Sequence, residues 1–126
     1  MVAFTFSKRE RMVSRQLIES LFGGSHSMVA YPVRAVFKTT GRQEGDEPVQ
    51  LLISVPKKHF KHAVDRNRVK RQLREAFRRH KHLLAERLPA DRQLLLAFVW
   101  LTNEHQLTLD VERCITKLLQ RVSERL

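Results

Sequence analysis

Apolar side chains recur at helical spacing over residues 66–84, and this pattern predicts an amphipathic helix. The positions on its apolar face are Val69, Leu73, Ala76, Phe77 and Leu84. A stripe of basic residues runs beside that face and consists of Lys70, Arg74, Arg78 and Lys81. We expect Asp65 to cap this helix, because its carboxylate can accept hydrogen bonds from the free amides of the first turn. The apolar face would then pack on a core while the basic stripe faces outward.

A first helix is predicted within residues 4–22, after an extended Phe-Thr-Phe at the start of that segment. Two caps compete: Ser7, which forms a capping-box pattern with Glu10, and Ser14, which would start a shorter helix. The shorter helix has the apolar face Leu17, Ile18, Leu21 and Phe22. Under either choice the two glycines at 23–24 end the helix, because glycine readily adopts the conformation of a C-terminal cap.

Three segments favour β-strands. Residues 28–38 alternate in character and place Val33, Ala35 and Phe37 on one face and Arg34, Val36 and Lys38 on the other. Pro32 lacks an amide proton, so we expect it at a sheet edge or at the start of a strand. Residues 49–55 predict a second, more buried strand. The unbroken apolar run at 93–101 predicts a central strand covered on both faces, with Trp100 in the core or at the sheet edge rather than as a platform for base stacking.

The loop at 39–48 holds two glycines, a proline and three acids. Because these acids lack an ordered ligand spacing, we expect the tip of a hairpin there rather than a cation site. A last helix is predicted over residues 108–125, with Thr108 or Asp110 as its cap and Cys114 as a small buried residue. Its apolar stripe consists of Val111, Ile115, Leu118, Leu119, Val122 and Leu126.

The order of these elements predicts an α+β fold, with helices packed on a small mixed sheet in one two-layer domain over residues 1–126. A hydrophobic content of 42% is enough for a core without a metal or disulfide. The single cysteine excludes an internal disulfide and suits a reducing cytoplasm. No apolar run approaches the roughly 20 residues of a membrane span, and the first residues lack a signal-peptide core. We therefore expect a cytoplasmic protein without a membrane partner.

Positive charge is concentrated in one segment, residues 57–81. It holds 11 of the 24 Lys and Arg residues and two acids, a local charge of +9 out of a total of +11. Like charges recur four residues apart along its helix, which lowers helix stability unless an anion relieves the repulsion. Arg66 and Asn67 stand at the expected helix start, where free amides also favour phosphate. This pattern indicates a polyanionic partner, and we interpret it as a nucleic acid.

Catalytic chemistry has little support in the sequence. Asp65 and Glu75 are the acids of the basic segment, and ten residues on one helix separate them, so they cannot converge alone on a metal pair. Four histidines crowd the same region, namely His59, His62, His80 and His82. Their spacing could suit zinc or a general base, but no cysteine lies nearby to complete a zinc site. We expect no catalytic residue and no metal site in the protein itself, and no small-molecule substrate.

The basic segment also carries a family resemblance. Arg66-Asn67-Arg68-Val69-Lys70-Arg71, followed by Arg74-Glu75 and Phe77-Arg78, resembles the signature of the bacterial ribonuclease P protein subunit. The upstream segment at 54–58, the Arg-Glu-Arg-Met run at 9–12 and Phe22 also match that family, as do the length and the order of elements. The resemblance implies a protein without an active site of its own. Its partners would be a catalytic RNA, which cleaves with Mg²⁺, and precursor tRNA, whose 5′ leader is removed.

The resemblance further implies a left-handed β-α-β crossover and a division of the binding surface. Contacts with the RNA subunit fall to Arg66, Asn67, Arg68, Lys70, Arg71, Arg74 and Arg78. Contacts with the leader fall to Phe22, Arg15, Lys57, Lys58 and Lys61. The chain departs from the family where Ile18 replaces an aromatic residue and Ala35 a tyrosine, so leader binding would depend more on charge. Two alternatives stay open: a ribosomal-type RNA-binding protein, and a protein-only nuclease that uses the histidines.

Overall fold

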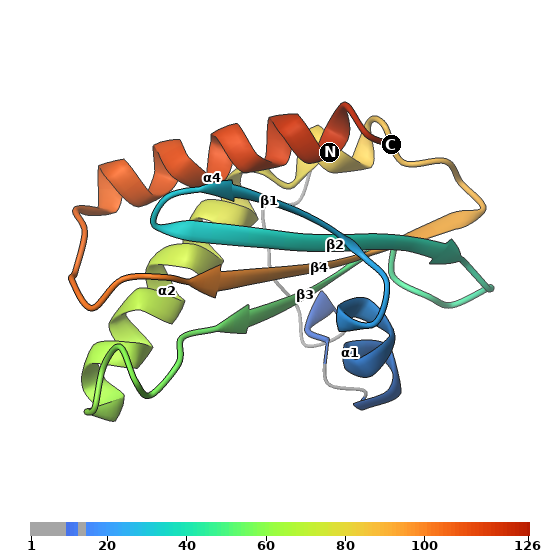
Figure 1. The fold of residues 1–126 in the computed structure, drawn as a ribbon. Helices are drawn as coiled ribbons and strands as arrows, with labels where there is room; N and C mark the ends of the chain where they lie inside the picture. Colours follow the sequence, from blue (N-terminus) through green and yellow to red (C-terminus); the bar gives the residue numbers. More distant parts are fainter. Residues whose placement is uncertain (1–9, 13–14) are drawn as a thin grey trace.

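A mixed sheet forms the centre of the molecule, with the strand order β1-β2-β4-β3 (Figure 1). The structure is a computed structural model that describes residues 10–12 and 15–126. The strands are β1 (His26–Ala30), β2 (Val33–Gly41), β3 (Val49–Ser54) and β4 (Arg92–Trp100). β1 pairs with β2 and β2 with β4 in antiparallel register, whereas β3 and β4 run parallel. The predicted mixed sheet and α+β class are therefore confirmed.

Two predictions about the strands were wrong. Residues 28–38 are not one strand, because a turn at Tyr31-Pro32 divides them into β1 and β2. Pro32 stands directly before β2, the strand-start position that its missing amide favours. The loop after Gly41 is not a hairpin tip, since β2 and β3 are separated in the sheet by β4. Alternation of side chains reports the face of a strand but not its neighbour, which is why the sequence did not show this order.

The helices are α1 (Arg15–Phe22), α2 (Ala63–His80), the short α3 (His82–Ala85) and α4 (Thr108–Ser123). α2 and α4 cover one face of the sheet, and α1 lies against the other face. All five predicted apolar positions of the basic helix are buried. The fifth of them, Leu84, lies in α3 rather than in α2. No helix in residues 10–12 and 15–126 is both long enough and apolar enough to cross a lipid bilayer.

The predicted helix caps were also wrong where the structure describes them. α2 begins three residues before Arg66, and its N-cap is His62, whose side chain makes no capping bond. Asp65 lies in the first turn instead, where His105 contacts its carboxylate. The N-cap of α4 is Leu107, so Thr108 and Asp110 lie inside the helix. The competing caps of the first helix, Ser7 and Ser14, lie outside the described residues.

The core has two parts, one on each side of the sheet. The larger part lies between the sheet and the pair α2 and α4, and it contains the fully buried Trp100, as predicted. The smaller part joins α1 to the opposite face through Met12, Leu21, Val36, Leu95 and Ala97. β4 contributes side chains to both parts, which explains its unbroken apolar run. Cys114, predicted to be buried, is half-buried, and its thiol donates to the carbonyl oxygen of Ala30 at 2.8 Å.

The crossover from β3 through α2 to β4 joins two parallel neighbours of the sheet. In the view of Figure 1 both strands point to the left, β4 lies above β3, and α2 passes behind the sheet. This arrangement is a left-handed crossover, as the resemblance implied and against the usual right-handed preference. It carries the basic helix along the β3 edge of the sheet, where residues 11–12 also lie: the amide of Met12 donates to the carbonyl oxygen of Leu51 at 2.9 Å.

Candidate nucleic-acid interface

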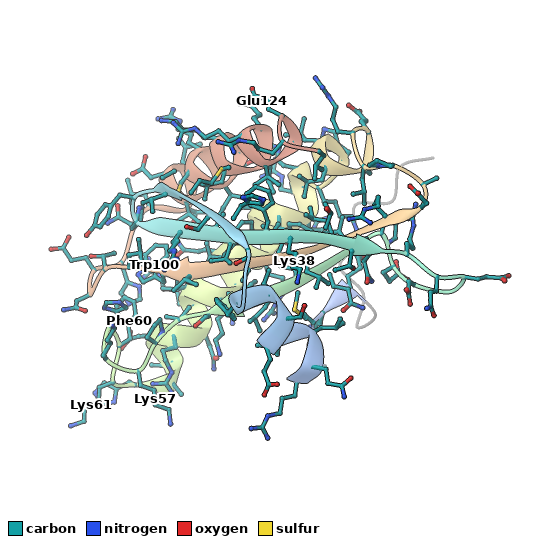
Figure 2. All side chains as sticks on the ribbon, turned by 45° about the vertical axis from the view of Figure 1, so that its right-hand side comes forward. Lys38, Lys57, Phe60, Lys61, Trp100 and Glu124 are labelled. Carbon is teal, nitrogen blue, oxygen red and sulfur yellow. The ribbon has the colours of Figure 1, made fainter. Side chains whose placement is uncertain are left out.

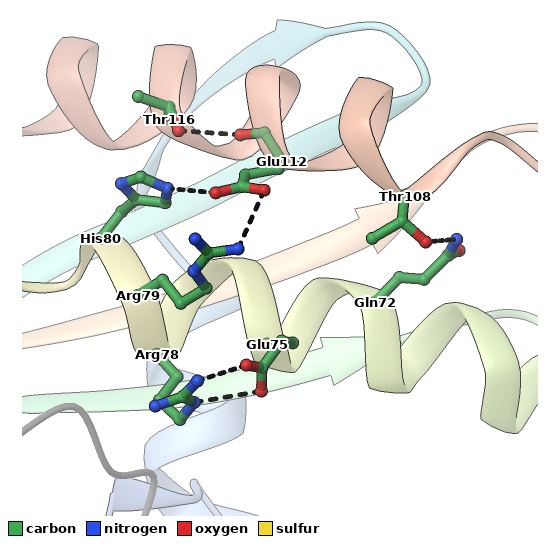
Figure 3. Close-up of polar contacts among 8 residues, drawn as sticks. All are labelled: Gln72, Glu75, Arg78, Arg79, His80, Thr108, Glu112 and Thr116. Atoms are coloured by element: carbon green, nitrogen blue, oxygen red, sulfur yellow. Dashed lines mark hydrogen bonds and ion pairs between the residues drawn. The ribbon is translucent and has the colours of Figure 1, made fainter.

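The basic stripe of α2 is only partly free of acidic partners. Lys70 and Arg74 border a groove of about 190 Å³, whose other wall is formed by β3 and residues 11–12. Arg78 forms an ion pair with Glu75 on the same helix (Figure 3). Lys81 lies 2.9 Å from a carboxylate oxygen of Glu10 in a contact that is largely shielded from water. The first half of the stripe is therefore the part that faces a groove without an acid.

Arg74 is partly buried and is repelled by two neighbouring arginines. Burial and the neighbouring charges of Arg11 and Arg71 lower the pKa of its guanidinium. The group stays charged at neutral pH, since arginine titrates far above that range. Three cations that crowd one another in this way are stabilised by an anion placed among them. The middle of α2 and the adjacent groove are thus suited to phosphate.

The predicted contacts with the RNA subunit differ in how they are held. Asn67, Arg68 and Arg71 are exposed on α2. Arg66 is half-buried, and its Nη1 donates at 2.9 Å to the carbonyl oxygens of Phe60 and Lys61. This guanidinium therefore holds the loop between β3 and α2 against the helix start. Whether any of these residues contacts RNA stays a prediction.

The predicted leader contacts lie on two separate parts of the surface. Lys57, Lys58 and Lys61 are exposed on the loop between β3 and α2, and Figure 2 shows Lys57 and Lys61 pointing away from the body of the molecule. Phe22 ends α1 with 51% of its surface exposed, so it is not a core residue. Arg15 is also exposed, and it pairs with Glu19 at 3.1 Å.

A row of side chains between these two parts was missed by the sequence analysis. Val29, Arg34, Val99 and Ser54 are cross-strand neighbours and cross all four strands. They share the sheet face on which α1 lies, but α1 covers the adjacent row, where Val36 and Ala97 are buried. The row itself is exposed at β1 and β2 and half-buried at β4 and β3. We call these four residues the open row, and no local pattern could show that α1 leaves it uncovered.

The histidines and acids near the basic helix make structural contacts. Nδ1 of His59 lies 2.6 Å from the Oδ1 atom of Asn103. His105 lies 3.1 Å from Asp65 and stacks on Phe60, with 4.5 Å between the ring centroids. These contacts hold the loop before α4 against the start of α2. In the described part of the chain no group of three or more His, Cys, Asp or Glu residues is placed to hold a metal ion.

Comparison with known proteins identifies the family. The profile of the family described as Ribonuclease P matches residues 6–123. The chain belongs to the ribonuclease P protein family. The ribonuclease P protein component of Porphyromonas gingivalis is 40% identical over 122 residues, which are 95% of this chain and 88% of the relative.

Solved structures of ribonuclease P proteins share the fold. A mutant of the Staphylococcus aureus protein, described as defective in mRNA degradation activity, superimposes with a TM-score of 0.71 at 20% identity. That alignment covers 93% of this chain and 90% of the other. The Thermotoga maritima protein superimposes with a TM-score of 0.64 at 25% identity, over 89% of this chain and 96% of the other. The predicted family and fold class are both confirmed.

Proposed function

We propose that this chain is the protein subunit of a bacterial ribonuclease P and assists a catalytic RNA in removing the 5′ leader of precursor tRNA. The observation that carries this proposal is the basic side of α2 on a member of this family: Arg68 and Arg71 are exposed, and the half-buried Arg74 borders a groove whose described lining contains no acid. The protein would bind RNA, and the RNA would break the phosphodiester bond. Mg²⁺ would act on the RNA subunit, as the resemblance to the family implies.

The proposal divides the surface between two RNA segments. The run on α2 would hold the phosphates of the RNA subunit, with Arg66, Asn67, Lys70 and Arg78 beside it. The single-stranded leader would lie along the open row, between Phe22 on α1 and the lysines of the loop at 57–61. Single strands are commonly bound by a basic groove combined with a ring on which a base stacks. Phe22 supplies such a ring and Arg34 a charge on the floor.

Reconstitution tests the proposed function. The purified protein alone should leave precursor tRNA intact, both with Mg²⁺ and with EDTA. Together with a bacterial ribonuclease P RNA it should stimulate cleavage at low Mg²⁺, measured as the rate of release of the 5′ leader. Absence of stimulation would reject the proposal and favour a different RNA-binding role. Cleavage by the protein alone in EDTA would instead support a nuclease that uses the histidines.

A second test concerns the leader. Phe22→Ala should weaken the binding of precursor tRNA with a long leader by about 1–3 kcal/mol, the contribution of one stacked base. It should leave the affinity for leaderless tRNA unchanged, because the ring has no other RNA partner in this proposal. Dissociation constants of the reconstituted complex for both substrates measure the difference.

The matched control for this test is Leu107→Ala, which removes an apolar side chain that is 71% exposed and lies directly before α4. It should change neither affinity. An equal loss with leaderless and leader-bearing tRNA in the Phe22 variant would show that the proposed path of the leader is wrong.

A further inference from the structure

The outer face of α4 carries a second basic stripe that the proposed function does not use. A basic residue stands at every fourth position: Arg113, Lys117 and Arg121 in the helix and Arg125 in the turn that follows. All four are exposed. Each step of four residues rises by about 6 Å and turns by about 40°, so the charges form an inclined row on a rigid support.

The charges of this stripe are not neutralised within the protein. Among the described residues, none of the four basic side chains forms an ion pair with an acid; Arg121 donates to the backbone oxygen of Val29 at 3.4 Å. The acids of this region lie at the two ends, where Asp110 occupies the first turn of α4 and Glu124 its C-cap. Like charges four residues apart destabilise a helix, and a bound anion would remove that cost.

A third acid, Glu112, also lies at the N-terminal end of the stripe, directly before Arg113, and is already paired with α2. Glu112 accepts from Arg79 at 3.3 Å and contacts Nε2 of His80 at 2.9 Å, so both of its oxygens face α2 (Figure 3). Beside it lies a groove of about 500 Å³ between the end of α2 and α4, and Arg113 and Lys117 border this groove. The groove therefore presents positive charge to solvent.

The stripe and the α2 surface point in different directions. Lys70 and Arg74 face the groove along β3. Gln72, on another side of the same helix, donates to the backbone oxygen of Gln106 and to the hydroxyl of Thr108 at the start of α4 (Figure 3). α4 thus lies on the side of α2 away from the β3 groove, and one short RNA segment cannot contact both surfaces.

We propose that Arg113, Lys117, Arg121 and Arg125 bind the phosphate backbone of a second RNA double helix, separate from the RNA held by α2. The inference rests on the proposed function, since it adds a second contact to the same ribonucleoprotein. A double helix suits the site better than a single strand, because no Phe, Tyr or Trp lines the groove for base stacking. Double-stranded RNA is recognised through its shape and its phosphates, which a rigid row of charges can follow.

Titration with a short blunt-ended RNA hairpin tests this inference at about 0.15 M salt, where weak long-range attraction is screened. The wild-type protein should bind two hairpins, as measured by calorimetry. Arg113→Gln/Lys117→Gln/Arg121→Gln should bind one, and so should the matched variant Arg68→Gln/Arg71→Gln/Arg74→Gln. The salt dependence of the α4 site should correspond to about one released counterion per basic residue, a log–log slope near −3 to −4.

Two controls make the result specific. The variant Arg113→Lys/Arg121→Lys keeps the charges and should still bind two hairpins, and circular dichroism should show unchanged helix content in every variant. A wild-type stoichiometry of one, or an α4 glutamine variant that still binds two, overturns the inference. Equal affinity of the α4 site for a single strand of the same length overturns its assignment to a double helix.

The two proposals can fail separately. Stimulation of precursor-tRNA cleavage by the wild-type protein reports on the proposed function and requires no hairpin at α4. If cleavage is stimulated and the α4 glutamine variant still binds two hairpins, only the second RNA contact is rejected. If cleavage is not stimulated, the proposed function is rejected, whatever the number of hairpins bound.

Discussion

Replacing Arg68, Arg71 and Arg74 together with alanine should lower the affinity for a ribonuclease P RNA by about 40-fold or more. A hydrogen bond to a charged group contributes roughly 1.5–3 kcal/mol. Half of the lower value for each of these three partly solvated contacts gives more than about 2 kcal/mol of binding free energy in total. A loss of about 1.4 kcal/mol raises the dissociation constant tenfold. The log–log dependence of affinity on salt should also become shallower by about three, one for each lost phosphate contact.

The same variant should be at least as stable as the wild type, which separates binding from folding. Alanine has the highest helix propensity, and the substitution removes a partly buried charge whose pKa is lowered by burial and by the neighbouring charges of Arg11 and Arg71. Urea unfolding and filter binding on the same preparations measure the two effects. The control with lysine at all three positions should keep most of the affinity. A loss of affinity that follows a loss of stability would mean that the three arginines support the fold rather than the RNA contact.

Phe77→Ala should lower the free energy of unfolding by about 3–5 kcal/mol, the usual cost of removing a large ring from a core. Phe77 is fully buried between α2 and the sheet, and its ring meets the edge of Phe98 on β4, with 6.2 Å between the centroids and 67° between the planes. This contact fixes the orientation of α2 and so of its basic surface. A loss of this size is a large part of the roughly 5–15 kcal/mol that stabilises a typical domain.

The measurement is the midpoint of urea unfolding, followed by tryptophan fluorescence, since Trp100 lies in the same core. Phe77→Leu is the matched control. It keeps most of the apolar volume, so its free energy of unfolding should fall clearly less than that of Phe77→Ala. If Phe77→Ala lost under about 1 kcal/mol, α2 would not depend on this ring for its place on the sheet.

Much of the local structure could be predicted because it depends on periodicity alone. The buried face of α2 and the two-sided burial of β4 follow from the spacing of apolar residues. The order of the strands could not be predicted, since β4 enters between two strands that precede it in the chain. The prediction of the helix cap was wrong because it depended on a contact that is distant in the sequence. Asp65 contacts His105, 40 residues away, instead of the first free amides of α2.

The candidate site was predictable in composition and less so in geometry. Net charge located the basic helix, but it did not show that Lys81 contacts Glu10, 71 residues away, or that Arg66 holds the loop before α2. The open row depends on where α1 ends on the sheet, which no sequence pattern reports. The stripe on α4 was not identified from the sequence, since the residues outside 57–81 are close to neutral in total; the structure shows that Glu112, directly before Arg113, faces α2.

The strand order has a consequence for how the chain assembles during synthesis. The ribosome delivers β2, β3 and the whole basic helix before β4, yet β3 is hydrogen-bonded in the sheet to β4 and not to β2. Until residues 92–100 emerge, the nascent chain has the β1–β2 hairpin, a β3 without its neighbour β4 in the sheet, and a highly cationic helix without the central strand against which it packs. The basic helix is therefore exposed to cellular RNA before its own fold is complete, and a chain that stops before residue 92 cannot form the sheet.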